Sequence, residues 1–140
     1  MATRPRVLFL CTHNSARSQM AEGWLRHLDG KRYEVHSAGT EATRVQPLAI
    51  RVMAEADIDI SRHESKTLER CLNQPWDYVI TVCDDANEAC PAFPGGKVRL
   101  HWSFPDPSRV AGSEDEQLAV YRQVREAIRE RIKAFVASEA

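Results

Sequence analysis

The stretch Val7-Leu8-Phe9-Leu10-Cys11-Thr12-His13-Asn14-Ser15-Ala16-Arg17-Ser18 decides the fold of this chain. Its first residues are apolar and favour β-structure, Cys11 ends the apolar run, and a short polar loop follows. Beyond the loop, Met20, Trp24 and Leu28 are spaced as on one face of a helix. We therefore expect a buried strand, a loop and a helix in direct succession.

A loop between a strand and a helix N-terminus presents several backbone N–H groups to one point, at the positive end of the helix dipole. Cys11 begins this loop and Arg17 ends it, so a thiol and a planar guanidinium fork can face the same anion. The helix end and the arginine both favour the thiolate over the thiol. The sequence thus predicts that Cys11 attacks the central atom of a tetrahedral oxyanion. The residues expected to bind this oxyanion are Thr12, His13, Asn14, Ser15, Ala16, Arg17 and Ser18.

A cysteine followed six positions later by an arginine is a weak pattern by itself. The alternative interpretation is a buried cysteine at a strand end with a solvated arginine nearby. The predicted strand before the loop, the predicted helix after it, and the small polar residues Asn14 and Ser15 favour the oxyanion site instead.

The composition limits the kind of protein this is. With 140 residues, of which 43% are hydrophobic, the chain is long enough for one domain and short for two, so residues 1–140 are expected to form a single domain. A net charge of −1 gives no reason to expect nucleic acid or an anionic membrane surface as a partner. The apolar run of residues 7–11 is too short for a signal peptide or a membrane span. We expect a cytoplasmic protein, and a monomer.

The four cysteines are Cys11, Cys71, Cys83 and Cys90. In the cytoplasm they are expected to be reduced, so any disulfide would be transient and catalytic. No Cys-x-x-Cys pair occurs, and the five histidines form no convincing ligand set, so no bound metal is predicted. Cys71 is expected to be a core residue.

Further strands and helices are expected after the opening unit. The predicted strands are residues 33–39, 76–83 and 98–102, and the predicted helices begin at Pro47, at Ser65 and near Glu114. Alternating strands and helices indicate an α/β fold, with a parallel sheet and helices on both of its faces. Four chemically useful residues then follow the carboxyl ends of strands and meet at one edge of the sheet: Cys11, Ser37, Cys83 and Asp106.

Residues 11–23 resemble the anion-binding loop of the low-molecular-weight tyrosine phosphatases, and Ser18-Gln19-Met20-Ala21-Glu22-Gly23-Trp24 resembles in particular the arsenate reductases of that fold. The resemblance covers nearly the whole chain. It implies a four-stranded parallel sheet in the order 2-1-3-4, in which the strands that end at Cys11 and Cys83 are neighbours. Neighbouring strands lie about 4.8 Å apart, which is within the reach of a disulfide.

The cysteine spacing resembles that of the thioredoxin-coupled arsenate reductases. Their relay implies that Cys11 attacks arsenate, that Cys83 attacks the Cys11–arsenic adduct to release arsenite, and that Cys90 attacks Cys83. Thioredoxin would then reduce the Cys83–Cys90 disulfide, in a role in arsenic detoxification. The residues do not distinguish thioredoxin from glutaredoxin or mycothiol as the reductant. Seven helical residues span about 10.5 Å, so this disulfide requires residues 84–89 to loop out or unwind.

Asp106 lies between Pro105 and Pro107, which stiffen the loop around it. The resemblance implies that Asp106 is the general acid that protonates the leaving oxygen, whereas the alternative is an aspartate in a proline-rich turn. The phosphatases often have a tyrosine after the Asp-Pro pair, where this chain has Ser108. This difference favours a small inorganic substrate, arsenate, with phosphate or sulfate as competing oxyanions.

Asn14, Glu22 and Ser37 match the ligand positions of a monovalent-cation site in the family. Potassium-binding members have a Thr-Ser-Asp stretch where this chain has Glu64-Ser65-Lys66. We therefore expect the ammonium group of Lys66 to occupy the space of a potassium ion, which puts potassium binding in question. No bound cofactor is expected.

Two other functions stay open. In a low-molecular-weight protein tyrosine phosphatase, Cys83 and Cys90 would be idle. A non-catalytic protein that binds arsenite or responds to redox state through its thiols would need neither Arg17 nor Asp106. An arsenate reductase, with weak phosphatase activity at most, is the leading interpretation. It gives a role to Cys11 and also to Arg17, Cys83, Cys90 and Asp106.

Overall fold

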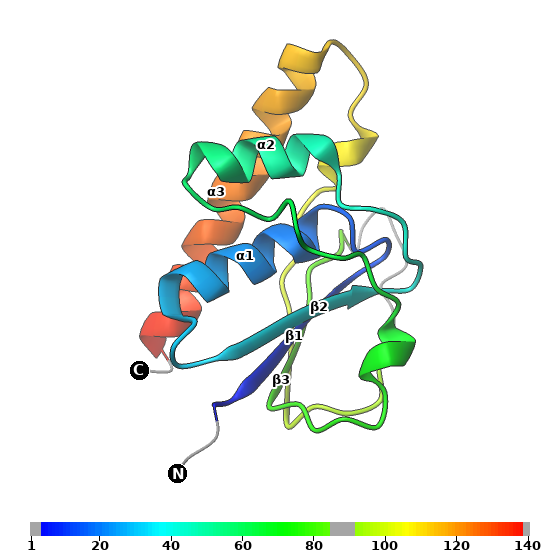
Figure 1. Cartoon of the computed structure of the whole chain (residues 1–140), viewed down its shortest axis with the longest axis vertical. Coiled ribbons are helices and arrows are strands. Elements are labelled where there is room, and N and C mark those ends of the chain that lie inside the picture. Colours follow the sequence, from blue (N-terminus) through cyan, green and yellow to red (C-terminus); the bar gives the residue numbers. More distant parts are fainter. Residues whose placement is uncertain (1–3, 85–91, 139–140) are drawn as a thin grey trace.

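The computed structural model describes residues 4–84 and 92–138. At its centre is a parallel sheet of four strands in the order β2-β1-β3-β4 (Figure 1). The strands are β1 (Arg6–Cys11), β2 (Glu34–Gly39), β3 (Tyr78–Thr81) and β4 (Val98–His101). The predicted α/β fold and the predicted strand order 2-1-3-4 are confirmed.

Three α-helices and two short 3-10 helices connect and cover the strands. They are α1 (Arg17–Asp29), α2 (Pro47–Glu55), η1 (Leu68–Cys71), η2 (Pro107–Arg109) and α3 (Glu114–Ser138). The helix expected at Ser65 forms only as the single 3-10 turn η1, three residues later than predicted. α2 begins at Pro47 as expected, because proline lacks only an N–H that the first turn leaves unpaired anyway.

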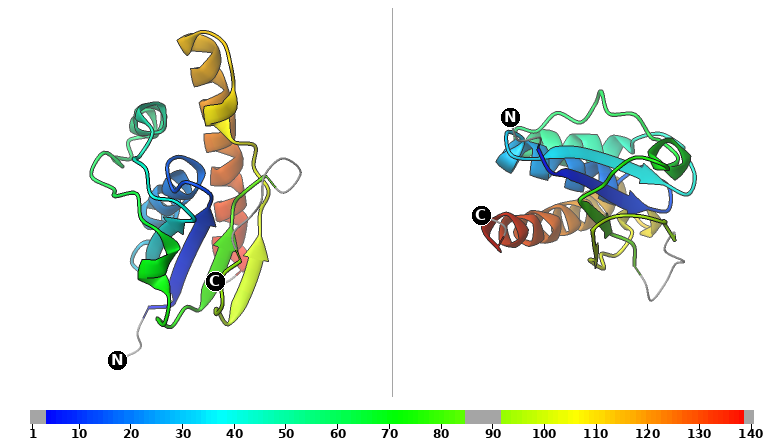
Figure 2. Two further views of the ribbon diagram at one scale, coloured as in Figure 1. Left: turned by 90° about the vertical axis from the view of Figure 1, so that its right-hand side faces the viewer. Right: turned by 90° about the horizontal axis from the view of Figure 1, so that it is seen from below.

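Strand β1 is buried on both faces, as the continuous apolar run of a central parallel strand predicts. Val7 and Phe9 point into a core that the three α-helices share, and Figure 2 shows α3 running along β3 and β4. Leu8 and Leu10 point the other way, into a smaller core formed with η1 and the chain around it. Helices therefore lie on both faces as expected, but all three α-helices are on one face.

Cys71 lies in the smaller core and is only 5% exposed, as predicted for a core residue. Burial raises the pKa of its thiol, so the side chain stays protonated. A buried thiol of this kind is chemically inert.

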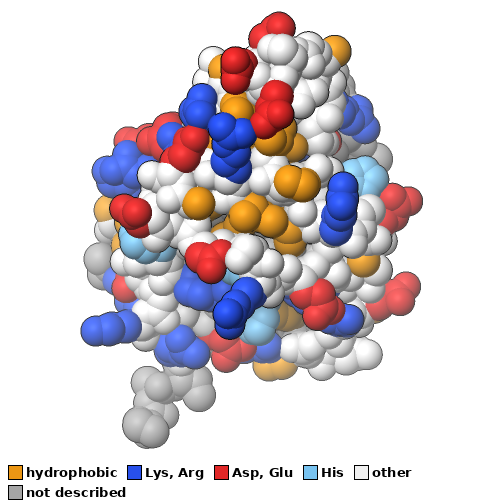
Figure 3. Space-filling model, turned by 45° about the horizontal axis from the view of Figure 1, so that its top comes forward, with side chains coloured by type: hydrophobic (Ala, Val, Ile, Leu, Met, Phe, Trp, Pro, Cys, Tyr) orange, Lys and Arg blue, Asp and Glu red, His pale blue; other side chains and the backbone are white. Residues whose placement is uncertain are grey.

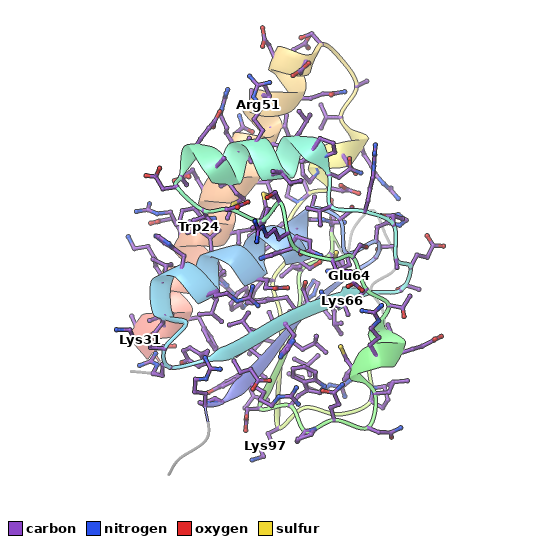
Figure 4. The ribbon with its side chains drawn as sticks, viewed as in Figure 1. Trp24, Lys31, Arg51, Glu64, Lys66 and Lys97 are labelled. Atoms are coloured by element: carbon purple, nitrogen blue, oxygen red, sulfur yellow. The ribbon has the colours of Figure 1, made fainter. Side chains whose placement is uncertain are left out.

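The outer surface carries charges of both signs, interspersed around a central group of hydrophobic side chains on the face shown in Figure 3. Ion pairs join α2 to α3. Arg51, labelled in Figure 4, contacts Glu114 at 2.7 Å, and Glu55 accepts hydrogen bonds from Arg122 and Arg125. These hydrogen bonds, that of Arg122 above all, lower the pKa of Glu55 to about 2. None of the helices within residues 4–84 and 92–138 has the length and apolar character to cross a membrane.

The end of β2 packs directly against the loop that follows β1. A Cβ atom added to Gly39 would lie 2.7 Å from the backbone nitrogen of Asn14 and 2.8 Å from the carbonyl oxygen of Thr12. Only glycine fits here, because real Cβ atoms do not approach backbone so closely. A Cβ at Gly23 in α1 would instead meet side-chain methyl groups, the nearest of them on Ile60 at 2.9 Å.

Alanine substitutions at Gly39 and Gly23 are expected to differ in their effects on phosphate binding and on thermal stability. We expect Gly39→Ala to weaken phosphate binding roughly tenfold or more, because the displaced backbone belongs to the predicted oxyanion loop. We expect Gly23→Ala to lower the melting temperature and leave phosphate affinity unchanged, because it disturbs only core side chains. Isothermal titration with phosphate and thermal unfolding measure both effects. Equal phosphate affinity in Gly39→Ala and the wild type would contradict the prediction.

Candidate active site

The nucleophile expected from the sequence lies at the end of β1 and is nearly enclosed. Cys11 is 2% exposed. Its Sγ atom is 2.8 Å from Oγ of Ser18, and it accepts a hydrogen bond from the backbone N–H of Asn14 at 3.3 Å. Ser18 therefore contacts the sulfur as well as belonging to the predicted oxyanion loop.

The carbonyl groups of the oxyanion loop are held from outside the loop. Four consecutive carbonyl oxygens accept hydrogen bonds at 2.8–3.1 Å from donors elsewhere in the chain. The pairs are Thr12 with Glu41 N–H, His13 with Ser65 Oγ, Asn14 with Gln19 Nε2, and Ser15 with Gln46 N–H. Because the C=O and N–H of a trans peptide point in opposite directions, this anchoring turns the N–H groups towards the inside of the loop.

Two further features favour an anion inside the loop. Asn14 has φ 51°, in the left-handed region that asparagine tolerates, and such a residue is typical of loops whose successive N–H groups surround an anion. The residue before α1 is Ala16, which makes no side-chain cap. The first turn of α1 is therefore not closed off by a capping side chain.

Arg17 joins the loop to the predicted general acid. Its side chain is 3% exposed, and its guanidinium donates to the carbonyl oxygen of Phe104 at 3.1 Å and lies 3.5 Å from Oδ2 of Asp106. The Asp106 side chain is 8% exposed. The structure thus brings Cys11, Arg17 and Asp106 to one edge of the sheet, where the carboxyl ends of parallel strands meet.

The residues of the predicted cation site also come together. Nδ2 of Asn14 donates to Oγ of Ser18 and to Oγ of Ser37, and Ser37 donates to Glu22 at 2.5 Å. These residues are buried, and their hydrogen bonds form a continuous path from the Cys11 sulfur to the Glu22 carboxylate.

Lys66 does not lie as expected. Its backbone N–H donates to Oδ1 of Asn14 at 2.8 Å, but its ammonium group is exposed and donates to the carbonyl oxygen of Glu64, close to the end of β2 (Figure 4). The charge next to Glu22 comes instead from Arg26, at 2.7 Å, with His63 at 3.8 Å. Burial of His63 lowers the pKa of its ring, so it supplies less positive charge than Arg26.

Sequence reasoning overlooked several of these contacts. Arg26 follows Glu22 by four residues on a helix, a spacing that often marks an ion pair. The donors Glu41, Ser65 and Gln46 carry no such signal, because they reach the loop only through the assembled fold. His13 lies at the rim, where its Nδ1 is 3.2 Å from Glu41.

The second predicted thiol lies beside the first strand. Cys83 follows β3, which pairs with β1, and it is fully buried. Cys83 is disulfide-bonded, whereas Cys11 and Cys71 are free. Cys90 lies outside the described residues. Within the described parts of the chain, no three His, Cys, Asp or Glu side chains are placed to hold a metal ion.

Comparison with known proteins relates this geometry to other chains. The arsenate reductases of Halalkalibacterium halodurans and Bacillus subtilis are 48% and 43% identical to this chain, each over 92% of this chain and 93% of the relative. An arsenate reductase solved in an oxidized state matches with a TM-score of 0.81 and 33% identity, over 96% of this chain and 98% of the other.

A thioredoxin-dependent arsenate reductase of Corynebacterium glutamicum matches with a TM-score of 0.68 and 32% identity, over 98% of this chain and 64% of the other. The family model for low molecular weight phosphotyrosine protein phosphatases matches residues 6–139. The loop, the sheet order and these matches agree, and the chain belongs to the low molecular weight phosphotyrosine protein phosphatase family.

Proposed function

We propose that this chain reduces arsenate to arsenite, uses thioredoxin as its reductant and serves in arsenic detoxification. The observation that carries the proposal is one site that combines the required groups. Cys11 begins the oxyanion loop and Arg17 ends it, and Asp106 contacts Arg17. Cys83 follows the neighbouring strand β3. The relatives named arsenate reductase span nearly the whole chain, which supports the same activity here.

Arsenate binds in the oxyanion loop. The inward N–H groups, the first turn of α1 and the Arg17 guanidinium supply its hydrogen bonds and positive charge. The Cys11 thiolate forms a sulfur–arsenic bond while Asp106 protonates the departing oxygen, which leaves as water. Arsenic is still in the +5 state after this step.

Reduction takes place in the next step. The Cys83 thiolate attacks the Cys11 sulfur, and the electron pair of the sulfur–arsenic bond stays on arsenic, which leaves as arsenite in the +3 state. Cys11 and Cys83 are then joined, and attack by Cys90 on Cys83 frees Cys11. A dithiol of thioredoxin reduces the resulting disulfide.

The alternatives use less of the site. A tyrosine phosphatase needs Cys11, Arg17 and Asp106 but gives no role to a buried cysteine on the adjacent strand end. A non-catalytic thiol protein explains neither the buried Arg17 nor its pairing with Asp106. Arsenate-dependent NADPH consumption with thioredoxin and its reductase tests the proposal, beside a parallel assay with glutaredoxin and glutathione.

Substitutions of the cysteines are expected to affect arsenate reduction and the hydrolysis of phosphate esters differently. Cys11→Ser abolishes arsenate reduction and any hydrolysis of phosphate esters, because both begin with the same nucleophile. Cys83→Ser and Cys90→Ser abolish only multiple-turnover reduction, because hydrolysis needs one nucleophile and water. Cys71→Ser is the matched control outside the relay. Normal steady-state reduction by Cys90→Ser would remove Cys90 from the mechanism.

Asp106→Asn is expected to lower the rate of arsenate reduction by about 10²–10⁴, because the amide cannot supply the proton. Inhibition by phosphate should change little, since the loop and Arg17 remain. Asp59→Asn, in an exposed turn, serves as the control. A rate for Asp106→Asn within a few-fold of the wild type would show that another group is the acid.

We also propose that an internal guanidinium replaces a bound potassium ion. Arg26 lies at 2.7 Å from Glu22, so the chain already supplies the positive charge that this buried carboxylate requires. Activity and melting temperature of the wild type should then respond alike to sodium and potassium at matched ionic strength. Arg26→Gln should lower the melting temperature more than Lys66→Gln does. Saturable stabilisation of the wild type by potassium alone would refute this.

A further inference from the structure

The two oxygens of the Asp106 carboxylate have different surroundings. Oδ1 accepts hydrogen bonds from the backbone N–H of Ser108 at 2.9 Å and from its hydroxyl at 2.6 Å. Oδ2 lies 3.5 Å from the Arg17 guanidinium and 3.7 Å from that of Arg109. Oδ1 therefore faces the turn that contains Ser108, and Oδ2 faces Arg17, which ends the oxyanion loop.

We propose that Ser108 is a positioning residue for the general acid: it holds Oδ1, so that Oδ2 is the oxygen that carries the proton to the leaving group. This inference rests on the proposed function, because it assigns a role within the same reaction. Ser108 does not contact the oxyanion loop in the hydrogen bonds described and acts through Asp106.

The serine hydroxyl adds a constraint that the backbone does not. Pro105 and Pro107 restrict the chain around Asp106, which leaves the side-chain torsions as the main freedom of the carboxyl group. The outer torsion of aspartate is broad, so the plane of the carboxyl group is weakly fixed by the side chain itself. Two donors that meet at one oxygen fix this plane and hold the other oxygen on the side of Arg17.

The charged and titratable groups around Asp106 come from three elements. Arg17 belongs to α1, Arg109 to η2 and Tyr121 to α3. Burial, and to a smaller extent Asp106 itself, raise the pKa of Tyr121 to about 12, so the phenol stays neutral in the working range. Ser108 binds the carboxylate more strongly than the neutral acid. Its removal should therefore move the alkaline limb of the kcat profile to higher pH.

The chain contains the same turn at a second place, which provides a matched control. Oδ1 of Asp59 accepts from the backbone N–H of Ser61 at 2.8 Å and from its hydroxyl at 2.5 Å, in an exposed turn before η1. Ser61→Ala therefore measures the structural cost of losing such a hydroxyl contact without touching the site.

The experiment compares Ser108→Ala, Ser108→Thr and Ser61→Ala in arsenate reduction over a range of pH. We expect Ser108→Ala to lower kcat roughly five- to twentyfold with KM for arsenate within about twofold, and to shift the alkaline limb upward. Ser108→Thr keeps the hydroxyl and should restore most of kcat. Ser61→Ala should leave kcat and the pH profile unchanged.

An unchanged kcat and pH profile in Ser108→Ala would overturn the inference, as would a loss confined to KM. A wild type that does not reduce arsenate refutes the proposed function instead. Ser108→Ala is then compared with the wild type in hydrolysis of phenyl phosphate, whose poor leaving group also requires the acid. If the wild type neither reduces arsenate nor hydrolyses phenyl phosphate, Asp106 is not a general acid, and the inference about Ser108 is refuted as well.

Discussion

The structure depends on where the carbonyl groups of the oxyanion loop find their hydrogen bonds. A buried backbone carbonyl needs a donor, and a carbonyl that pointed towards the centre of the loop would repel an anion there. Here the donors come from Glu41 and Gln46 after β2, from Ser65 before η1 and from Gln19 in α1. The predicted oxyanion site therefore forms only once β2 and β1 are paired and α1 is docked.

The same site places charge inside the protein, which is stable only when each charge is paired. Arg17 and Glu22 are both buried, and their partners are Asp106 in one case and Arg26 with Ser37 in the other. Removal of one partner leaves an uncompensated charge, which is more costly than loss of the pair as a whole. The paired charges of Arg17 and Glu22 therefore also help to fix how the core packs around α1.

The sequence predicted what is local and missed what requires the assembled fold. The strand, loop and helix around Cys11 and the long α3 follow from periodicity over neighbouring residues, and the sheet order followed from the family resemblance. The position of Lys66 could not be predicted, because its backbone N–H is bound by Asn14, which lies 52 residues away, and its ammonium group then reaches the Glu64 carbonyl. The hydrogen bonds of Glu41, Gln46 and Ser65 to the loop were missed for the same reason.

Arsenate and phosphate have the same shape and charge, so a loop of N–H groups and one guanidinium binds both by the same contacts. Binding therefore cannot decide between a reductase and a phosphatase. The two reactions separate after Cys11 is attached to the oxyanion: arsenic(V) can accept the electron pair of its bond to sulfur, and phosphorus(V) cannot do so under these conditions. That step requires a second thiol next to the first. The pairing of β1 with β3 places Cys83 beside the end of β1, and it is this second thiol, not the sheet itself, that distinguishes the proposed reductase from a phosphatase built on the same loop.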